Sequence, residues 1–197
     1  MRLTTSIISA AMGSLATGAA VGAERPTLVS MGGKPVTLLG SEVTVGQKAP
    51  DFTVVDADFN PVRLGDFKGR VVLISAVPSL DTRVCSLQTK RFNEEAAALG
   101  PGVQVLTISE DLPFAQARFC KAEKIEGIKV LSDSVTREFG LGYGLLIKGR
   151  GLLARSVFVV DQDGVIRYLE LVAELTREPD YARALDAARQ AARDKGR

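Results

Sequence analysis

The sequence predicts an α/β domain with a mixed central sheet. Apolar runs of strand length recur in the middle of the chain, and segments with helical spacing of apolar residues separate them. The last two expected strands are joined by the turn Asp161-Gln-Asp-Gly164, which predicts an antiparallel hairpin. Strand, helix, strand, helix and strand, followed by a hairpin and a helix, is the order of a layered α/β sheet.

The expected elements run from an N-terminal hairpin to a basic helix at the C-terminus. Residues 24–33 are expected to be a loose segment, and β-branched stretches around Gly40-Ser41 predict a hairpin within 35–45. Further strands are expected at 52–56, 62–64, 70–77, 103–109, 128–131, 154–160 and 165–172. Helices are expected at 81–99, 113–124, 136–139 and 180–195. A thioredoxin-like fold satisfies this order, with a domain at 34–192 and a polar tail at 193–197.

Composition excludes several classes of function. The 197 residues include 25 basic and 23 acidic side chains, and the net charge of +2 is too small for an electrostatic nucleic-acid binder. The sequence has no histidine, which excludes Ser-His-Asp and Cys-His catalysis and histidine-ligated metals within one chain. Its two cysteines cannot supply four soft ligands for zinc or an iron–sulfur cluster. We therefore expect no metal or cofactor, and a small neutral or apolar substrate.

The first 23 residues differ from the rest and predict a cleaved secretory signal. Arg2 is followed by the uncharged stretch 3–23, and Val21-Gly22-Ala23 offers the small residues that a signal peptidase needs. A cytosolic extension is the alternative, because polar residues interrupt the apolar stretch and its basic start is weak. No later segment reaches the ~20 apolar residues of a membrane span, so no membrane anchor is expected. The location would be periplasmic after cleavage and cytoplasmic otherwise.

The segment Val77-Pro-Ser-Leu-Asp-Thr-Arg-Val-Cys85 lies between the most apolar strand and the first long helix. The carboxyl end of a strand and the amino end of a helix meet there, and α/β proteins place ligands at such junctions. With Asp81 or Thr82 as the helix cap, Cys85 falls in the first helical turn. Unpaired backbone N–H groups, the positive end of the helix dipole and the nearby Arg83 would all stabilise a thiolate.

A thiolate at this position could attack the O–O bond of a peroxide and become a sulfenic acid, without a metal or a histidine. The reaction needs donors that hold the peroxide and stabilise charge on its oxygens, a role suited to the Thr82 hydroxyl and a guanidinium. Arg155 is the best guanidinium candidate because it interrupts an apolar strand, where an unpaired buried charge is costly. The pattern alone leaves open an edge-strand arginine that points to solvent.

The residues alone leave several roles open for Cys120, which falls on the second expected helix, with Asp111 as a plausible cap. It could be a small core residue, half of a structural disulfide with Cys85, or a thiol that attacks the sulfenic acid. A structural disulfide would fit a non-catalytic exported module. A thioredoxin-like disulfide oxidoreductase is disfavoured, because Cys85 is followed by Ser-Leu-Gln88 and not by a Cys-x-x-Cys pair.

At Pro78-Ser-Leu-Asp-Thr-Arg-Val-Cys85 the sequence resembles the thiol peroxidases of the Tpx type, which are atypical two-cysteine peroxiredoxins. The peroxiredoxin signature is Pro-x-x-x-Thr-x-x-Cys, and the resemblance extends from about Gly33 to Ala192. Three further stretches resemble the same branch: Ser109-Glu-Asp-Leu-Pro-Phe-Ala-Gln-Ala-Arg-Phe-Cys120, Gly151-Leu-Leu-Ala-Arg-Ser-Val157 and Val172-Ala-Glu-Leu-Thr-Arg-Glu-Pro-Asp-Tyr181.

The resemblance implies roles for five residues. Cys85 would be the peroxidatic cysteine and Cys120 the resolving one, joined in a Cys85–Cys120 disulfide during turnover. Thr82 and Arg155 would activate the thiolate and the peroxide, and Pro78 would shield the thiolate. The family fold is the peroxiredoxin form of the thioredoxin fold, with flanking helices and an N-terminal β-hairpin.

The resemblance also implies partners and motion. It implies a homodimer that reduces alkyl or lipid hydroperoxides and is itself reduced by thioredoxin. Members of this branch are usually cytosolic, so an exported protein would need a periplasmic dithiol protein as its reductant. Cysteines on separate helices are expected to lie farther apart than the ~4.4 to 6.8 Å Cα separation of a disulfide. The first turn near Cys85 must then unwind, and the oxidised form should lose order from Ser79 to Gln88.

Overall fold

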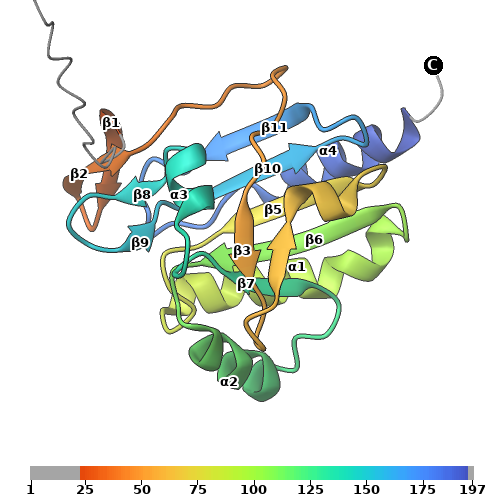
Figure 1. Ribbon diagram of the computed structural model, residues 1–197, viewed down its shortest axis with the longest axis horizontal. Coiled ribbons are helices and arrows are strands. Elements are labelled where there is room, and N and C mark those ends of the chain that lie inside the picture. The colour runs from red at the N-terminus through yellow and green to blue at the C-terminus, as the bar shows by residue number, and fades with distance from the viewer. Residues whose placement is uncertain (1–22, 195–197) are drawn as a thin grey trace, which may run out of the picture.

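The computed structural model describes residues 23–194 and is built on a seven-stranded mixed sheet (Figure 1). The strand order is β11 (Ile166–Leu171), β10 (Ser156–Val160), β5 (Val71–Ala76), β6 (Val103–Ser109), β7 (Lys129–Ser132), β3 (Thr53–Val55) and β4 (Pro61–Arg63). The three central strands β5, β6 and β7 are parallel to one another, and the outer neighbours pair antiparallel. The α/β class and the mixed sheet are therefore confirmed.

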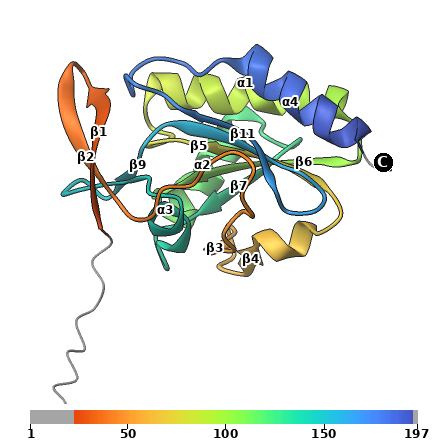
Figure 2. The same ribbon diagram turned by 90° about the horizontal axis from the view of Figure 1, so that it is seen from above.

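Helices α1 (Arg83–Leu99) and α4 (Tyr181–Arg193) cover one face of this sheet (Figure 2). The apolar cluster on that face includes Leu73 and Val157 from the strands and Phe92 and Leu185 from the helices. Helix α2 (Pro113–Glu123) contributes Phe119 at the border of the same cluster. Every second residue of β5 and β10 points to this side, as the pleat of a strand requires.

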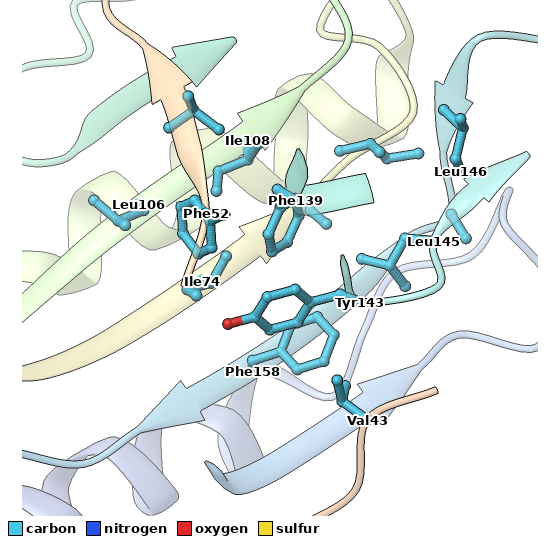
Figure 3. Packing of buried hydrophobic residues seen from close by; sticks show 14 of the residues in the cluster. Val43, Phe52, Ile74, Leu106, Ile108, Phe139, Tyr143, Leu145, Leu146 and Phe158 are labelled. Carbon is cyan, nitrogen blue, oxygen red and sulfur yellow. The ribbon is translucent and has the colours of Figure 1, made fainter. Parts of the chain in front are cut away.

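The other residues of β5 and β10 pack into a second cluster on the opposite face (Figure 3). Phe158 meets the Tyr143 ring edge to face at 5.2 Å between centroids, and Phe52 meets Phe139 at 5.0 Å. Phe139 belongs to the short helix α3 (Glu138–Gly142), and the 3-10 helix η1 (Leu64–Phe67) adds Phe67 to the cluster. Because both faces are covered, β5 is buried along its whole length, which explains its continuous apolar run.

A separate four-stranded sheet corrects the expectation for the N-terminal region. It consists of β1 (Glu24–Met31), β2 (Lys34–Leu39), β8 (Leu146–Ile147) and β9 (Leu152–Leu153). The expectation of a loose segment at 24–33 was wrong, because most of it forms β1, paired with β2 across Gly32-Gly33. Both glycines have positive φ, 61° and 75°, which suits a two-residue hairpin turn. Gly40 does not turn the chain there; a Cβ on it would lie 2.0 Å from the Leu141 carbonyl oxygen.

The expected signal segment at 1–23 lies outside the described residues apart from Ala23, and so does most of the tail at 193–197. Within 23–194, no helix combines the length and the apolar character needed to cross a membrane. The same described residues contain no group of three potential metal ligands of the His, Cys, Asp or Glu type.

Candidate active site

Cys85 lies at the junction that the sequence analysis identified. Strand β5 ends at Ala76, and α1 begins at Arg83 on the carboxyl side of the parallel strands. Thr82 occupies the N-cap position with an extended backbone, at φ −98° and ψ 145°. Cys85 is the third residue of the helix, its side chain is fully buried, and it forms no disulfide. The expected position in the first helical turn is therefore correct.

The Thr82 hydroxyl contacts the Cys85 sulfur. Its Oγ1 lies 2.8 Å from Cys85 Sγ and 3.0 Å from the Ser79 carbonyl oxygen, and it does not cap a backbone N–H group of α1. A hydroxyl has one proton to donate and can also accept. It can donate to a Cys85 thiolate, or accept from a Cys85 thiol while donating to Ser79. The Thr82 hydroxyl can therefore form a hydrogen bond with Cys85 whether the sulfur is a thiol or a thiolate.

Arg155 approaches the same sulfur from the connection between β9 and β10. Its side chain is 1% exposed, so the alternative of an arginine that points to solvent is wrong. Nη2 lies 3.3 Å from Cys85 Sγ, Nη1 donates to Gln88 Oε1 at 2.6 Å, and Nε donates to the Leu175 carbonyl oxygen at 3.0 Å. The planar guanidinium is fixed at three points, and one edge of it faces the sulfur.

The charge of Arg155 is not balanced by a carboxylate. Among residues 23–194, no Asp or Glu side chain forms a salt bridge with it. A fully buried cation is costly unless an anion accompanies it. The Cys85 sulfur, as a thiolate, is the group in contact that can supply a negative charge.

Gln88 is a site residue that the sequence analysis did not identify. It lies one helical turn after Cys85 and is fully buried. Its amide nitrogen donates to Ser75 Oγ at 2.8 Å while its oxygen accepts from Arg155. Gln88 therefore links the guanidinium to β5. A polar residue three positions after the cysteine, on the buried face of the helix, was the available signal.

Apolar side chains surround the sulfur on its other sides. Pro78 is buried in the loop before α1, and Val77 and Leu80 form a small cluster with Cys85. Phe119 of α2 and Val130 of β7 pack against this cluster. Such a wall keeps water away and strengthens the electrostatic contacts within the site. The structure thus brings Thr82 and Arg155 into contact with the Cys85 sulfur, and it buries Pro78 in the loop between β5 and α1.

Asp111 does not have the role that its position suggested. It was expected to cap α2, but Leu112 occupies the N-cap position and no side chain caps the helix. The Asp111 carboxylate instead accepts from Ser79 Oγ and from the Leu80 backbone N–H, each at 2.7 Å. It therefore reaches across from the end of β6 to hold the loop that precedes Thr82.

Cys120 lies apart from this site, near the end of α2. It is a half-buried free cysteine, and burial raises the pKa of its thiol. It packs at the border of the apolar cluster beneath α1 and α4. Helices α1 and α2 are joined at the surface by an ion pair between Lys90 and Glu123, at 2.9 Å. The expected pair of cysteines thus occupies neighbouring helices and forms no disulfide in this structure.

Two buried carboxyl groups lie at the same end of the sheet. Glu110 follows β6 and Asp133 follows β7, and both side chains are almost fully buried. Asp133 accepts from the backbone N–H groups of Phe139 and Gly140, at 3.1 and 2.7 Å. Burial, followed by repulsion from Asp133, raises the pKa of Glu110 to about 8, although Arg137 opposes this at 3.6 Å. Glu110 therefore keeps a proton at neutral pH.

Comparisons with known proteins agree with this fold. A family model described as Redoxin matches residues 44–185. Thiol peroxidases from Halalkalibacterium halodurans and Bacillus subtilis are 53% and 52% identical to this chain, over 83% and 82% of it and 98% and 96% of the relatives. The crystal structure of a peroxiredoxin-like protein from Aquifex aeolicus is 42% identical, with a TM-score of 0.79 over 86% of this chain and 99% of that one. The predicted thioredoxin-like fold and the resemblance are thereby confirmed, and the chain belongs to the Redoxin family as one of its thiol peroxidases, which are oxidoreductases of the peroxiredoxin type.

Proposed function

We propose that this protein reduces hydrogen peroxide and organic hydroperoxides with Cys85 as the peroxidatic residue. The observation that carries the proposal is the buried contact between the Arg155 guanidinium and the Cys85 sulfur, in the absence of a carboxylate partner among the described residues. That arrangement supplies a nucleophilic thiolate together with a fixed cation beside it. The curated thiol peroxidase relatives support peroxide as the substrate class.

In the first step, the thiolate attacks the terminal oxygen of the hydroperoxide. The S–O bond forms as the O–O bond breaks, which oxidises Cys85 to a sulfenic acid and releases an alkoxide or hydroxide. The leaving oxygen takes up a proton and departs as alcohol or water. Arg155 and the Thr82 hydroxyl, which both contact the sulfur, would donate to the peroxide oxygens as negative charge develops on them. Pro78 and its apolar neighbours would keep water from the sulfur.

In the second step, Cys120 resolves the sulfenic acid. Its sulfur attacks Cys85 Sγ to form the Cys85–Cys120 disulfide, and the hydroxyl leaves as water. The positions of Cys85 and Cys120 on the neighbouring helices α1 and α2 suit this role. Because Cys85 is fully buried in the first turn of α1 and Cys120 lies on another helix, that turn must open for the two sulfurs to meet.

A dithiol protein then returns the disulfide to two thiols. Thioredoxin is the expected reductant if residues 1–23 are retained, and a periplasmic dithiol protein if they are removed. Determining the N-terminal residue of the protein isolated from fractionated cells would decide between these two locations. A mature N-terminus at Glu24 in the periplasmic fraction would support export.

We further propose a homodimer that covers an exposed apolar patch made of Phe59, Leu112 and Phe114. Their exposed fractions are 45%, 60% and 61%, and the rings of Phe59 and Phe114 meet at 5.2 Å between centroids. Large apolar side chains gathered at a surface are typical of interfaces. Light scattering should give a dimer mass for the wild type and a monomer mass for Phe114→Glu. A monomeric wild type would contradict this assignment.

Peroxide consumption with a dithiol donor tests the catalytic proposal. Cys85→Ser should lose all consumption above the blank, because no other group in the site can become a sulfenic acid. Cys120→Ser should consume about one equivalent of peroxide and then stop, even when the dithiol donor is present. Continued turnover of Cys85→Ser would overturn the proposal. Amide exchange of the reduced and oxidised proteins tests the opening step, since protection from Ser79 to Gln88 should fall on oxidation.

A further inference from the structure

We propose that Asp111 is a positioning residue that controls how readily the loop before α1 opens after Cys85 has been oxidised. We name the contacts of its carboxylate with Ser79 and Leu80 the Asp111 clasp. The inference rests on the proposed function, because it concerns what happens to the sulfenic acid. In this proposal, Asp111 sets how much of the sulfenic acid goes to each of two competing reactions.

The clasp joins two parts of the molecule: the ends of the sheet strands β6 and β7, which form its rigid side, and the loop that precedes α1. On the rigid side, Ser109 Oγ donates to the Asp111 carboxylate at 2.8 Å, and Ser132 Oγ donates to its carbonyl oxygen at 2.7 Å. These serines are the last residues of β6 and β7, two paired strands of the central sheet. On the other side, the two contacts with Ser79 and Leu80 are charge-assisted hydrogen bonds, which are stronger than neutral ones.

The clasp connects directly to the reactive sulfur. The carbonyl oxygen of Ser79 accepts from Thr82 Oγ1, and the same Oγ1 lies 2.8 Å from Cys85 Sγ. Fixing Ser79 therefore fixes the hydroxyl that contacts the sulfur. While the clasp is closed, the segment from Ser79 to Cys85 keeps the conformation that a hydroperoxide would meet. The first turn of α1 can open only after the two hydrogen bonds of the clasp have broken.

A sulfenic acid at Cys85 has two competing fates. With the loop open, Cys120 attacks it and gives the disulfide and water. With the loop closed, a second hydroperoxide oxidises it to a sulfinic acid and leaves as the alcohol, which inactivates the enzyme. The second reaction uses the same closed site as the first oxidation. The strength of the clasp should therefore set the ratio of sulfinic acid to disulfide.

Asp111→Asn tests this, because it keeps the shape of the side chain but removes its charge and one of its two acceptor oxygens. Reduced protein would be treated with a range of hydrogen peroxide concentrations, and sulfinic acid and disulfide would be quantified by mass spectrometry. We expect the ratio of sulfinic acid to disulfide to fall roughly tenfold at a given peroxide concentration, the factor that one charge-assisted hydrogen bond contributes. Ser79→Ala removes only one contact of the clasp and should shift the ratio in the same direction by less.

Asp180→Asn is the matched control, because Asp180 caps α4 by accepting from the Arg183 backbone N–H and lies outside the site. It should leave the ratio at the wild-type value. If Asp180→Asn shifts the ratio as far as Asp111→Asn does, general loss of stability is the cause and the proposal is overturned. An unchanged ratio in Asp111→Asn also overturns it, provided that wild type forms the disulfide. Should Asp111→Asn fail to fold, Ser79→Ala decides, with an unchanged ratio counting against the clasp. A wild type whose Cys85 is never oxidised would instead refute the proposed function.

Discussion

The two cysteines of this protein differ above all in whether a charged side chain contacts the sulfur. Cys85 is fully buried, but a hydroxyl and a guanidinium contact its sulfur. Cys120 is half-buried among apolar side chains, and burial raises the pKa of its thiol. Burial without a charged partner favours the protonated thiol, whereas burial beside a cation favours the thiolate. In the proposed mechanism, this difference suits Cys85 for attack on the peroxide and Cys120 for the later resolving step.

Removing the cation should make the surroundings of Cys85 resemble those of Cys120. We expect Arg155→Met to slow the first oxidation of Cys85 by about 10²- to 10³-fold, the usual loss when one donor to a developing oxyanion is removed. Single-turnover peroxide consumption measures this rate. Arg155→Lys keeps the charge but loses the two guanidinium nitrogens that contact Gln88 and the sulfur. Its rate of first oxidation should therefore lie between those of wild type and Arg155→Met. A Met variant within twofold of wild type would show that the cation is not needed.

The position of Cys85 could be predicted because its signals are local. A buried strand and a helix follow one another within a short stretch, and Thr82 occupies the expected N-cap position between them, although its side chain contacts the Cys85 sulfur and does not cap the helix. The partners from distant segments were harder to find. Asp111 satisfies the sequence pattern of a helix cap, and only the approach of two loops shows that it binds Ser79 instead. Arg155 was a candidate because an arginine in an apolar strand needs an explanation, yet its burial could not be read from the pattern.

The N-terminal strand was missed for a different physical reason. Residues 24–31 contain two charged residues and Pro26 and lack a regular apolar alternation, so they look like a loop. In the structure they form the edge of the small sheet, where β2 is the neighbouring strand. An edge strand tolerates proline and polar residues because one of its sides needs no partner.

Removing the hydroxyl from Thr82 should have the next largest effect. Thr82→Val keeps the shape of the side chain but leaves Cys85 Sγ without its 2.8 Å contact. We expect the first oxidation to slow by roughly 10- to 100-fold, because one donor is lost while Arg155 remains. Thr82→Ser retains the hydroxyl and should stay within about threefold of wild type. Equal rates for the Val and Ser variants would show that the hydroxyl does not take part.

Gln88 offers a finer test, since it acts through Arg155 and does not contact the sulfur in the structure. Gln88→Leu fills the same space but removes the acceptor for Nη1 and the donor to Ser75. The guanidinium would lose one of its three fixed points, and we expect about a tenfold slower first oxidation. Gln88→Glu keeps an acceptor for Nη1 but gives Arg155 a carboxylate partner that competes with the thiolate for its charge, so this variant should not recover the wild-type rate. A Leu variant within twofold of the wild-type rate would show that Gln88 serves packing alone.

The smallest effect on peroxide reduction should come from Glu110, a buried carboxyl whose cation, Arg137 at 3.6 Å, is exposed, whereas the cation beside Cys85 is buried. The pKa of Glu110, about 8, is above the ordinary value of 4.5 expected in the unfolded chain, mainly because of burial. The folded state therefore holds a proton that the unfolded state releases, so stability is highest below about pH 4.5 and falls as the pH rises through 8. The groups that face this carboxyl are Asp133, Asp111 and Arg137. From about pH 5 to pH 9, urea unfolding of wild type should lose stability on the order of a few kcal/mol.

Glu110→Gln stays uncharged throughout that range, so its stability should vary much less with pH while its peroxide rate stays within about twofold of wild type. Glu94→Gln, at an exposed position on α1, is the matched control and should follow the wild-type curve. A wild-type stability that rises with pH would contradict the sign of this argument. A large loss of peroxide rate in Glu110→Gln would instead show that the carboxyl pair and the Cys85 site are coupled, although no contact in the structure joins Glu110 to the sulfur or to Arg155. The contrast would then extend from the two cysteines to the carboxyl edge of the sheet, where burial and repulsion from Asp133 outweigh the exposed Arg137 and leave Glu110 protonated.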